Sequence, residues 1–169
     1  MAATASNMLA LGTPAPNFSL PEVVSGRTIS LQQFVGMRGL LVMFLCAHCP
    51  YVKHVEQELA RLGHDYAVKG LGIVGISSND ATAYAEDTLE GLRAQSLRNR
   101  FTFHYLYDET QEVARAYHAA CTPDYFLFDS NSKLVYRGQL DASRPGNGIP
   151  VDGRDLRAAI DAVMADKPV

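Results

Sequence analysis

The sequence has little that would attract a charged partner or a membrane. Lys and Arg number 15 against 18 Asp and Glu, a formal net charge of −3, so no basic field exists to recruit nucleic acid or anionic lipid. The longest wholly apolar stretch, residues 39–47, is about half as long as a membrane-spanning helix. The first residues lack a basic stretch followed by an apolar core, so we expect no secretory signal and a cytoplasmic location.

Cysteine is scarce and tryptophan is absent. Three cysteines are too few for a disulfide scaffold, and a close pair of them in a reducing compartment suggests chemistry instead. The 169 residues are 47% hydrophobic and 20% charged, which is typical of one folded domain. No repeat or low-complexity stretch divides the chain, and we expect a tail at residues 1–12 followed by a single domain at residues 13–169.

The hydrophobic pattern predicts alternating strands and helices. Continuous apolar runs at residues 40–45 and 71–76 are typical of strands buried on both faces, so we expect them to be parallel and central. Apolar residues at steps of three and four after Pro50 predict an amphipathic helix that ends near Gly63. The other predicted elements are a hairpin at 17–20 and 27–30, a helix at 81–98, a strand at 103–107, a helix at 109–117, a hairpin at 125–128 and 133–137, and a helix at 152–165. This order predicts a mixed α/β sheet covered on both faces.

Two cysteines lie where the first apolar run meets the amphipathic helix, in the segment Cys46-Ala-His-Cys49-Pro50. Cys49 immediately precedes Pro50 and is therefore the predicted N-cap, where unpaired N–H groups and the helix dipole favour a thiolate. Lys53 adds positive charge one turn further on. Two other interpretations remain open: the cysteines could be small buried hydrophobes, or Cys46, His48 and Cys49 could bind a metal ion.

The same segment, followed by Tyr51, resembles the active-site region of the thioredoxin superfamily. The stretch from Leu11 to Leu20, with Ser30-Leu31, is similar to the redoxin, or AhpC/TSA, branch that contains the peroxiredoxins. The resemblance covers residue 11 to the final helix and implies a thioredoxin-like three-layer α/β/α sandwich with an N-terminal β-hairpin extension. It also implies that Thr122-Pro123 is a cis peptide facing the nucleophile, where it would bind the substrate.

Three features depart from the patterns of these relatives. Thioredoxins carry a second cysteine three residues after the first, and that position is Val52. The peroxiredoxin motif P-x-x-x-T-x-x-C, with its cysteine at Cys49, would need proline at Val42 and threonine at Cys46. The buried acid that thioredoxins carry just before the phenylalanine of the strand is replaced by Met43, so proton transfer must use another group or water.

Our main hypothesis is a thiol–disulfide oxidoreductase. Cys49 would attack a protein or small-molecule disulfide, and Cys46 would resolve the mixed disulfide; a thiol reductant such as thioredoxin would supply electrons. The first alternative is a thiol peroxidase in which Cys49 is oxidised by peroxide and resolved by Cys46 or Cys121. The second is a thioredoxin-fold module that binds a partner, or a soft metal such as Cu(I), without catalysis.

Further residues are accessory candidates in this hypothesis. His48 could stabilise the thiolate or transfer a proton, or it could be an ordinary loop histidine. Cys121 could be a second resolving thiol or a buried, inert one. The polar loop at 141–150 could offer Arg144 to a substrate or simply connect two elements. Under the main hypothesis we expect no cofactor and no metal ion.

Overall fold

The computed structural model describes residues 4–169 and is built on a mixed sheet of five strands. The strands lie in the order β5 (His104–Tyr107), β4 (Leu71–Ser77), β3 (Gly39–Phe44), β6 (Asp124–Asp129) and β7 (Leu134–Gly138). Strands β3, β4 and β5 are parallel, whereas β6 runs antiparallel to β3 and β7 antiparallel to β6. Every residue of β3 and β4 is buried, which explains their unbroken apolar sequences and confirms that both strands are parallel and central.

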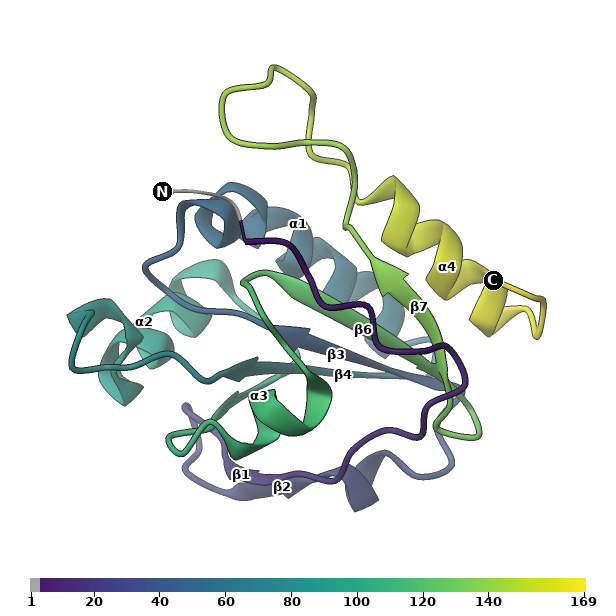
Figure 1. The fold of residues 1–169 in the computed structure, drawn as a ribbon, viewed down its shortest axis with the longest axis horizontal. Helices are drawn as coiled ribbons and strands as arrows, with labels where there is room; N and C mark the ends of the chain where they lie inside the picture. The colour runs from purple at the N-terminus through teal and green to yellow at the C-terminus, as the bar shows by residue number, and fades with distance from the viewer. Residues whose placement is uncertain (1–3) are drawn as a thin grey trace.

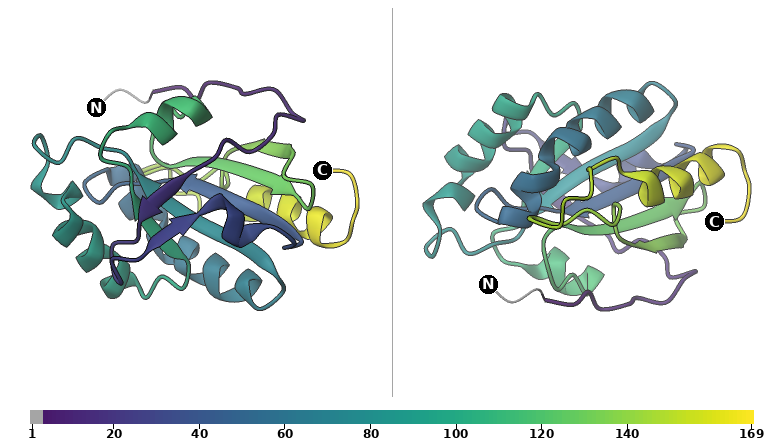
Figure 2. Two further views of the ribbon diagram at one scale, coloured as in Figure 1. Left: turned by 90° about the horizontal axis from the view of Figure 1, so that it is seen from below. Right: turned by 90° about the horizontal axis from the view of Figure 1, so that it is seen from above.

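Helices and a small hairpin cover the two faces of the sheet (Figures 1 and 2). One face packs against α1 (Pro50–Ala67), α2 (Leu89–Asn99) and α4 (Arg154–Met164). The other face packs against α3 (Glu112–Tyr117), the hairpin β1 (Ser19–Pro21) with β2 (Thr28–Ser30), and the 3-10 helix η1 (Leu31–Phe34). The predicted α/β sandwich with an N-terminal hairpin is therefore confirmed. No helix within residues 4–169 is both long and apolar enough to cross a membrane.

The helix predicted at residues 81–98 is wrong in its first half. Residues 81–83 form a turn, the 3-10 helix η2 covers Ala85–Asp87, and α2 begins only at Leu89. Thr88 caps α2, because its side-chain oxygen accepts a hydrogen bond from the N–H of Gly91. The segment before this cap turns Asp87 into the protein, where its side chain is fully buried. A continuous helix through these residues would not allow that turn.

Helix α1 also extends one turn beyond the predicted end near Gly63. Tyr66, in that last turn, is buried in the core. Gly63 is the point at which the helix approaches the segment before β5: a Cβ there would lie 3.0 Å from both Phe103 and Thr102. The glycine therefore permits close packing and does not end the helix.

Residues 4–12 form neither helix nor strand, but they are attached to the sheet. Their chain crosses in front of β6 and β7 in Figure 1. The guanidinium of Arg137 on β7 donates to the Asn7 carbonyl and to the Ser6 hydroxyl, and it also forms a buried ion pair with Asp124. The N-terminal segment is thus held against β7 at Arg137. Residues 1–3 of the predicted tail lie outside the described residues.

Candidate functional site

The nucleophile candidate Cys49 lies at the N-terminus of α1, as predicted. It is the N-cap residue, and Pro50 occupies the first helical position. A hydrogen bond from the Cys46 thiol is the largest cause that lowers the pKa of Cys49, to about 5. The N–H groups of Val52 and Tyr51 and the hydroxyl of Thr122 lower this pKa further, while burial opposes them. Cys49 is therefore a thiolate at neutral pH and lies in the half-buried position expected of a reactive cysteine.

The second thiol, Cys46, lies two residues beyond the end of β3 and is fully buried. The hydrogen bond that it donates to Cys49, its burial and the nearby charge of Asp87 raise the pKa of the Cys46 thiol. Its Sγ atom lies 3.3 Å from the hydroxyl oxygen of Thr122. The two thiols therefore have opposite character: one is an accessible thiolate and the other a buried, protonated thiol.

Thr122 lies against both sulfur atoms, although it is more than 70 residues away in the chain. The peptide bond between Thr122 and Pro123 is cis, as the resemblance implied. The carbonyl oxygen of Thr122 is 3.4 Å from Cys49 Sγ, and its hydroxyl is the neighbour of Cys46. The predicted placement of this dipeptide beside the nucleophile is confirmed.

A buried Asp–His pair adjoins the thiols, and its acidic member was not predicted from the sequence. Asp87 from η2 is fully buried, and its Oδ2 atom lies 2.5 Å from His48 Nδ1. The His48 ring stacks on Tyr84 at 3.6 Å, with the two rings nearly parallel. A ring nitrogen of His48, a carboxylate oxygen of Asp87 and Cys46 Sγ all lie within 4.8 Å of one another. The side chain of His48, a loop residue, therefore points to Asp87.

These three side chains could in principle be metal ligands. Zinc–nitrogen and zinc–oxygen bonds of about 2.0–2.2 Å place two tetrahedral ligand atoms on one ion about 3.4 Å apart. The separation of 2.5 Å between His48 Nδ1 and Asp87 Oδ2 is shorter than that, and the two atoms form a short hydrogen bond. The arrangement would have to open before it could hold an ion.

The other accessory candidates lie near the thiols with partners of their own. Lys53, one turn along α1, pairs with Glu86 in η2 at 3.1 Å. Cys121 is half-buried, and its Sγ lies 3.8 Å from the Pro123 carbonyl oxygen. Burial, helped by the charge of Asp124, raises the pKa of Cys121 to about 11. Cys121 is therefore a protonated thiol at neutral pH.

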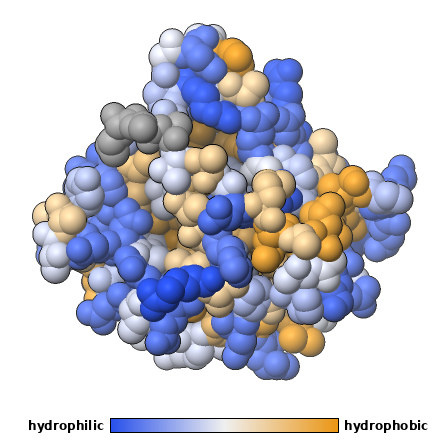
Figure 3. Space-filling view, viewed as in Figure 1, coloured by the Kyte–Doolittle hydropathy of each residue, from blue (hydrophilic) through white to orange (hydrophobic). Residues whose placement is uncertain are grey.

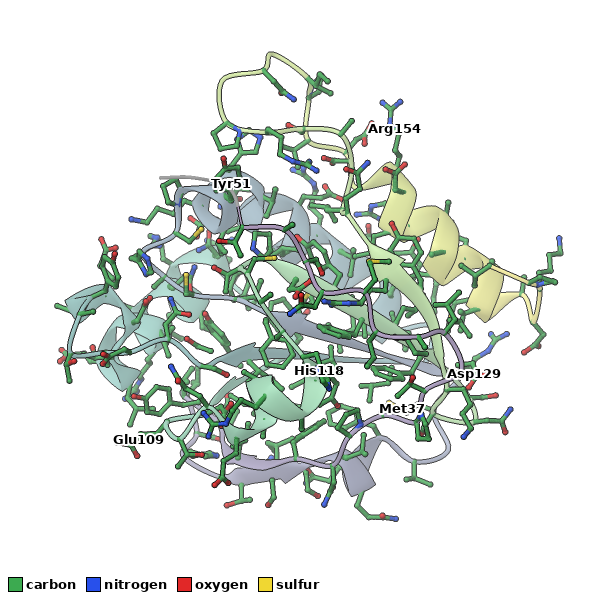
Figure 4. The ribbon with its side chains drawn as sticks, in the orientation of Figure 1. Met37, Tyr51, Glu109, His118, Asp129 and Arg154 are labelled. Carbon is green, nitrogen blue, oxygen red and sulfur yellow. The ribbon has the colours of Figure 1, made fainter. Side chains whose placement is uncertain are left out.

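A cavity of about 870 Å³ opens beside Cys49. Tyr51, labelled in Figure 4, lies in the first turn of α1. The wall residues come from α1, the cis-proline segment, the N-terminal segment and the loop before α4, and include Cys49, Tyr51, Cys121, Pro123, Met8 and Arg144. Both thiols that reach solvent, Cys49 and Cys121, thus face one space large enough for a small molecule or a peptide side chain.

The loop between β7 and α4 stands out from the body of the molecule beside this cavity (Figures 1 and 3). Arg144 lines the cavity, but its guanidinium donates to the carbonyls of Asp141 and Ser143 and to the side chain of Gln139. His54 on α1 donates to the Ser143 hydroxyl, which itself donates to a loop carbonyl. Arg144 therefore holds the loop in shape, and α1 anchors it.

Comparisons with known proteins identify the family and the fold. A model described as the AhpC/TSA family matches residues 11–137. An uncharacterized conserved protein from Geobacillus kaustophilus is 51% identical, with a TM-score of 0.97 over 100% of this chain and 89% of that one. A hypothetical protein from Sinorhizobium meliloti is 48% identical, with a TM-score of 0.95 over 97% of this chain and 89% of that one.

More distant structures share the fold. The thioredoxin domain of a thiol-disulfide oxidoreductase from Bacteroides vulgatus is 21% identical, with a TM-score of 0.72 over 93% of this chain and 99% of that one. No curated protein gives a significant match. The family match over most of the chain, together with the fold and the cis-proline beside two cysteines, shows that this chain belongs to the AhpC/TSA family of the thioredoxin superfamily.

Proposed function

We propose that this protein is a thiol–disulfide oxidoreductase in which Cys49 is the nucleophile and Cys46 the resolving thiol. The observation that supports this most is the opposite character of two neighbouring thiols: Cys49 is half-buried with its pKa lowered to about 5, and Cys46 is buried with its pKa raised. An exposed thiolate attacks external disulfides, and a protected thiol beside it attacks only after a mixed disulfide has formed.

The reaction has two exchanges. Cys49 Sγ forms a bond to one sulfur of the substrate disulfide, and the other substrate sulfur leaves as a thiolate. Cys46 Sγ then bonds to Cys49 Sγ, and the second substrate sulfur leaves with its electron pair. One substrate disulfide is reduced to two thiols while Cys46 and Cys49 are oxidised to a disulfide. An external reductant, either the dithiol of a thioredoxin or a small-molecule thiol, would return Cys46 and Cys49 to their reduced form.

The test is reduction of insulin disulfides by the reduced protein with a thiol regenerant. We expect Cys49→Ser to lose activity, and Cys46→Ser to accumulate a mixed disulfide that mass spectrometry identifies on Cys49. If Cys121→Ser stalls in that way and Cys46→Ser does not, Cys121 is the resolving thiol. Full activity of Cys49→Ser would refute the proposal.

The family match favours thiol peroxidase as a second candidate. In that reaction the Cys49 thiolate attacks the terminal peroxide oxygen, the O–O bond breaks to release an alcohol or water, and Cys49 becomes a sulfenic acid. Cys46 then displaces water to form the same disulfide. Peroxide consumption, compared with insulin reduction by the same sample, decides between the two functions. Trapping of a sulfenic acid on Cys49 by dimedone in the Cys46→Ser variant would favour the peroxidase.

A further inference from the structure

The buried thiol of Cys46 must lose its proton at one particular step. In the reduced protein it donates a hydrogen bond to the Cys49 thiolate. Once Cys49 is bonded to a substrate sulfur, that negative charge is gone and the acceptor is lost. Burial and the nearby charge of Asp87 still raise the pKa of the fully buried Cys46 in that state, so unassisted ionisation would be slow. The resolving step therefore needs a base close to Cys46.

The Asp87–His48 pair lies within reach of this thiol. One ligand atom from each residue lies within 4.8 Å of Cys46 Sγ, a gap that one water molecule or a small rotation of the thiol can bridge. The Asp87 side chain is fully buried, while that of His48 is 13% exposed. The pair thus extends from the interior, next to Cys46, to the surface beside Tyr84.

Hydrogen bonding determines which member of the pair can accept a proton. Asp87 Oδ1 accepts the N–H groups of Ala47 and His48, and Oδ2 accepts from the Asn79 amide and the His48 ring. These four donors match the four lone-pair sites of a carboxylate. A proton on Asp87 would have to displace one of them. The pairing places a hydrogen on His48 Nδ1 and leaves Nε2 as the ring atom that takes up a proton.

The other ionisable groups around the pair are already bound elsewhere. On α1, Glu56 bonds to Gln95 and Arg98, and Lys53 pairs with Glu86 of η2. Burial, helped by the charge of Asp87, raises the pKa of Tyr105 and Tyr107 on β5, so both phenols are protonated at neutral pH. Tyr84 stacks on the imidazole, and Cys46 Sγ lies beside the pair. His48 is thus the base that these contacts leave available.

Within residues 4–169, Cys121 has no comparable partner. Its Sγ faces the carbonyl of Pro123, which cannot take up a proton. The neighbouring carboxylate of Asp124 accepts two hydrogen bonds from Arg137 at 2.9 and 3.1 Å. The two candidate resolving thiols therefore differ in having a base nearby, and the difference favours Cys46.

We propose that Asp87 and His48 form a proton relay for Cys46, with Asp87 as a positioning residue that orients the His48 imidazole. This rests on the proposed function, because it assigns the base for the second exchange. In that step the Cys46 proton passes, through a bridging water, to Nε2 of His48 as the Cys46–Cys49 bond forms and the substrate sulfur departs with its electron pair. The imidazolium then returns the proton to the leaving thiolate or to solvent at the exposed side.

The experiment follows both exchanges in one stopped-flow trace. Reduced protein carrying Cys121→Ser is mixed with one equivalent of dithiobis(nitrobenzoate), an aromatic disulfide that releases a coloured thiolate. Attack by Cys49 releases the first equivalent, and resolution by Cys46 releases the second. We expect His48→Phe, which keeps a ring to stack on Tyr84, to leave the first phase within about twofold and to slow the second by roughly 100-fold or more. Asp87→Asn should slow the second phase in the same way.

The pH dependence separates a relay from mere structural damage. In the wild type a base held beside Cys46 should make the second phase only weakly dependent on hydroxide concentration. In His48→Phe it should instead rise in proportion to hydroxide concentration. His64→Asn and Asp166→Asn are matched controls at exposed positions, and both phases should be unchanged in them.

Two results overturn the relay, and they can be told apart. If both phases of His48→Phe and Asp87→Asn match the wild type, the proton leaves by another route and the proposed function stands. If the protein with intact Cys46 releases only one equivalent, Cys46 does not resolve Cys49, and the proposed function fails together with the relay.

Discussion

The acidity of Cys49 predicts an unusual dependence of its reactivity on pH. A pKa of about 5 replaces the ordinary 9.0. At pH 7 a thiol with the ordinary pKa of 9.0 is about 1% thiolate, whereas Cys49 is almost fully ionised. The fraction in the reactive thiolate form is therefore roughly 100-fold higher for Cys49. Nucleophilicity falls with pKa, and a Brønsted coefficient of about 0.4–0.5 over this shift costs roughly 40- to 100-fold. Near neutrality the two effects almost cancel.

The difference in reactivity between Cys49 and an ordinary thiol becomes large in acid. At pH 5 about half of Cys49 is thiolate, against about one part in 10,000 of an ordinary thiol, a gain of roughly 5,000-fold. After the same loss of nucleophilicity, Cys49 should react about 50- to 100-fold faster than an unperturbed thiol. A comparison made only at neutral pH would miss the perturbation.

The assay uses dithiodipyridine, whose absorbance change can be followed in acid. The first release of thiopyridone by the reduced native protein is measured from pH 4 to pH 9, and the same protein unfolded in denaturant provides the ordinary thiols. Peptide mapping after a brief reaction identifies the modified cysteine. The reasoning is refuted if the native profile has its midpoint above about pH 7.5, or if Cys46 is modified before Cys49.

Three further predictions test contacts around the site. Cys46→Ala should move the acid limb of the Cys49 profile to higher pH, because the largest cause that lowers this pKa is lost; the same probe measures it. Arg137→Met should leave the Asp124 carboxylate buried without its cation and cost about 3–5 kcal/mol in urea unfolding. Gly91→Ala should destabilise the protein and slow the second phase, because a Cβ there would lie 2.1 Å from the carbonyl oxygen of residue 86, next to the relay acid.

Each of these predictions has an internal check. An unchanged profile in Cys46→Ala would show that the helix N-terminus alone acidifies Cys49. Arg154→Met, in an exposed pair with Asp152, is the matched control for Arg137→Met and should leave the stability almost unchanged. Helix propensity alone favours alanine over glycine by about 1 kcal/mol, so a stabilised Gly91→Ala protein would show that η2 moves aside without cost.

The parts of the fold that were predicted correctly have signals that are local in the sequence. Only a strand buried on both faces removes every side chain of the apolar runs at 40–45 and 71–76 from water. The structure confirms this, because β3 and β4 are buried at every position. The N-cap position of Cys49 follows from a single neighbour, Pro50, which fits best in the first turn of a helix. The hairpin of β6 and β7 is indicated by the turn residues between them.

Asp87 could not be predicted for the opposite reason. Its partners Ala47 and His48 are 40 and 39 residues away in the chain, and an acid in a polar stretch is typical of an exposed helix. Tertiary contacts instead bury it, and α2 begins only after Thr88. The one local signal was the pairing of Thr88 with Gly91, which marks a cap inside the predicted helix.

The attachment of the N-terminal segment to Arg137 has a consequence for the order in which the protein is completed during synthesis. Residues 6 and 7 are made before their hydrogen-bond partner on β7, which is about 130 residues later in the chain. This wall of the cavity therefore cannot close until the last strand of the sheet has been made. Cys49 is made long before that point, so the nascent chain carries its nucleophile before it has the wall that encloses it.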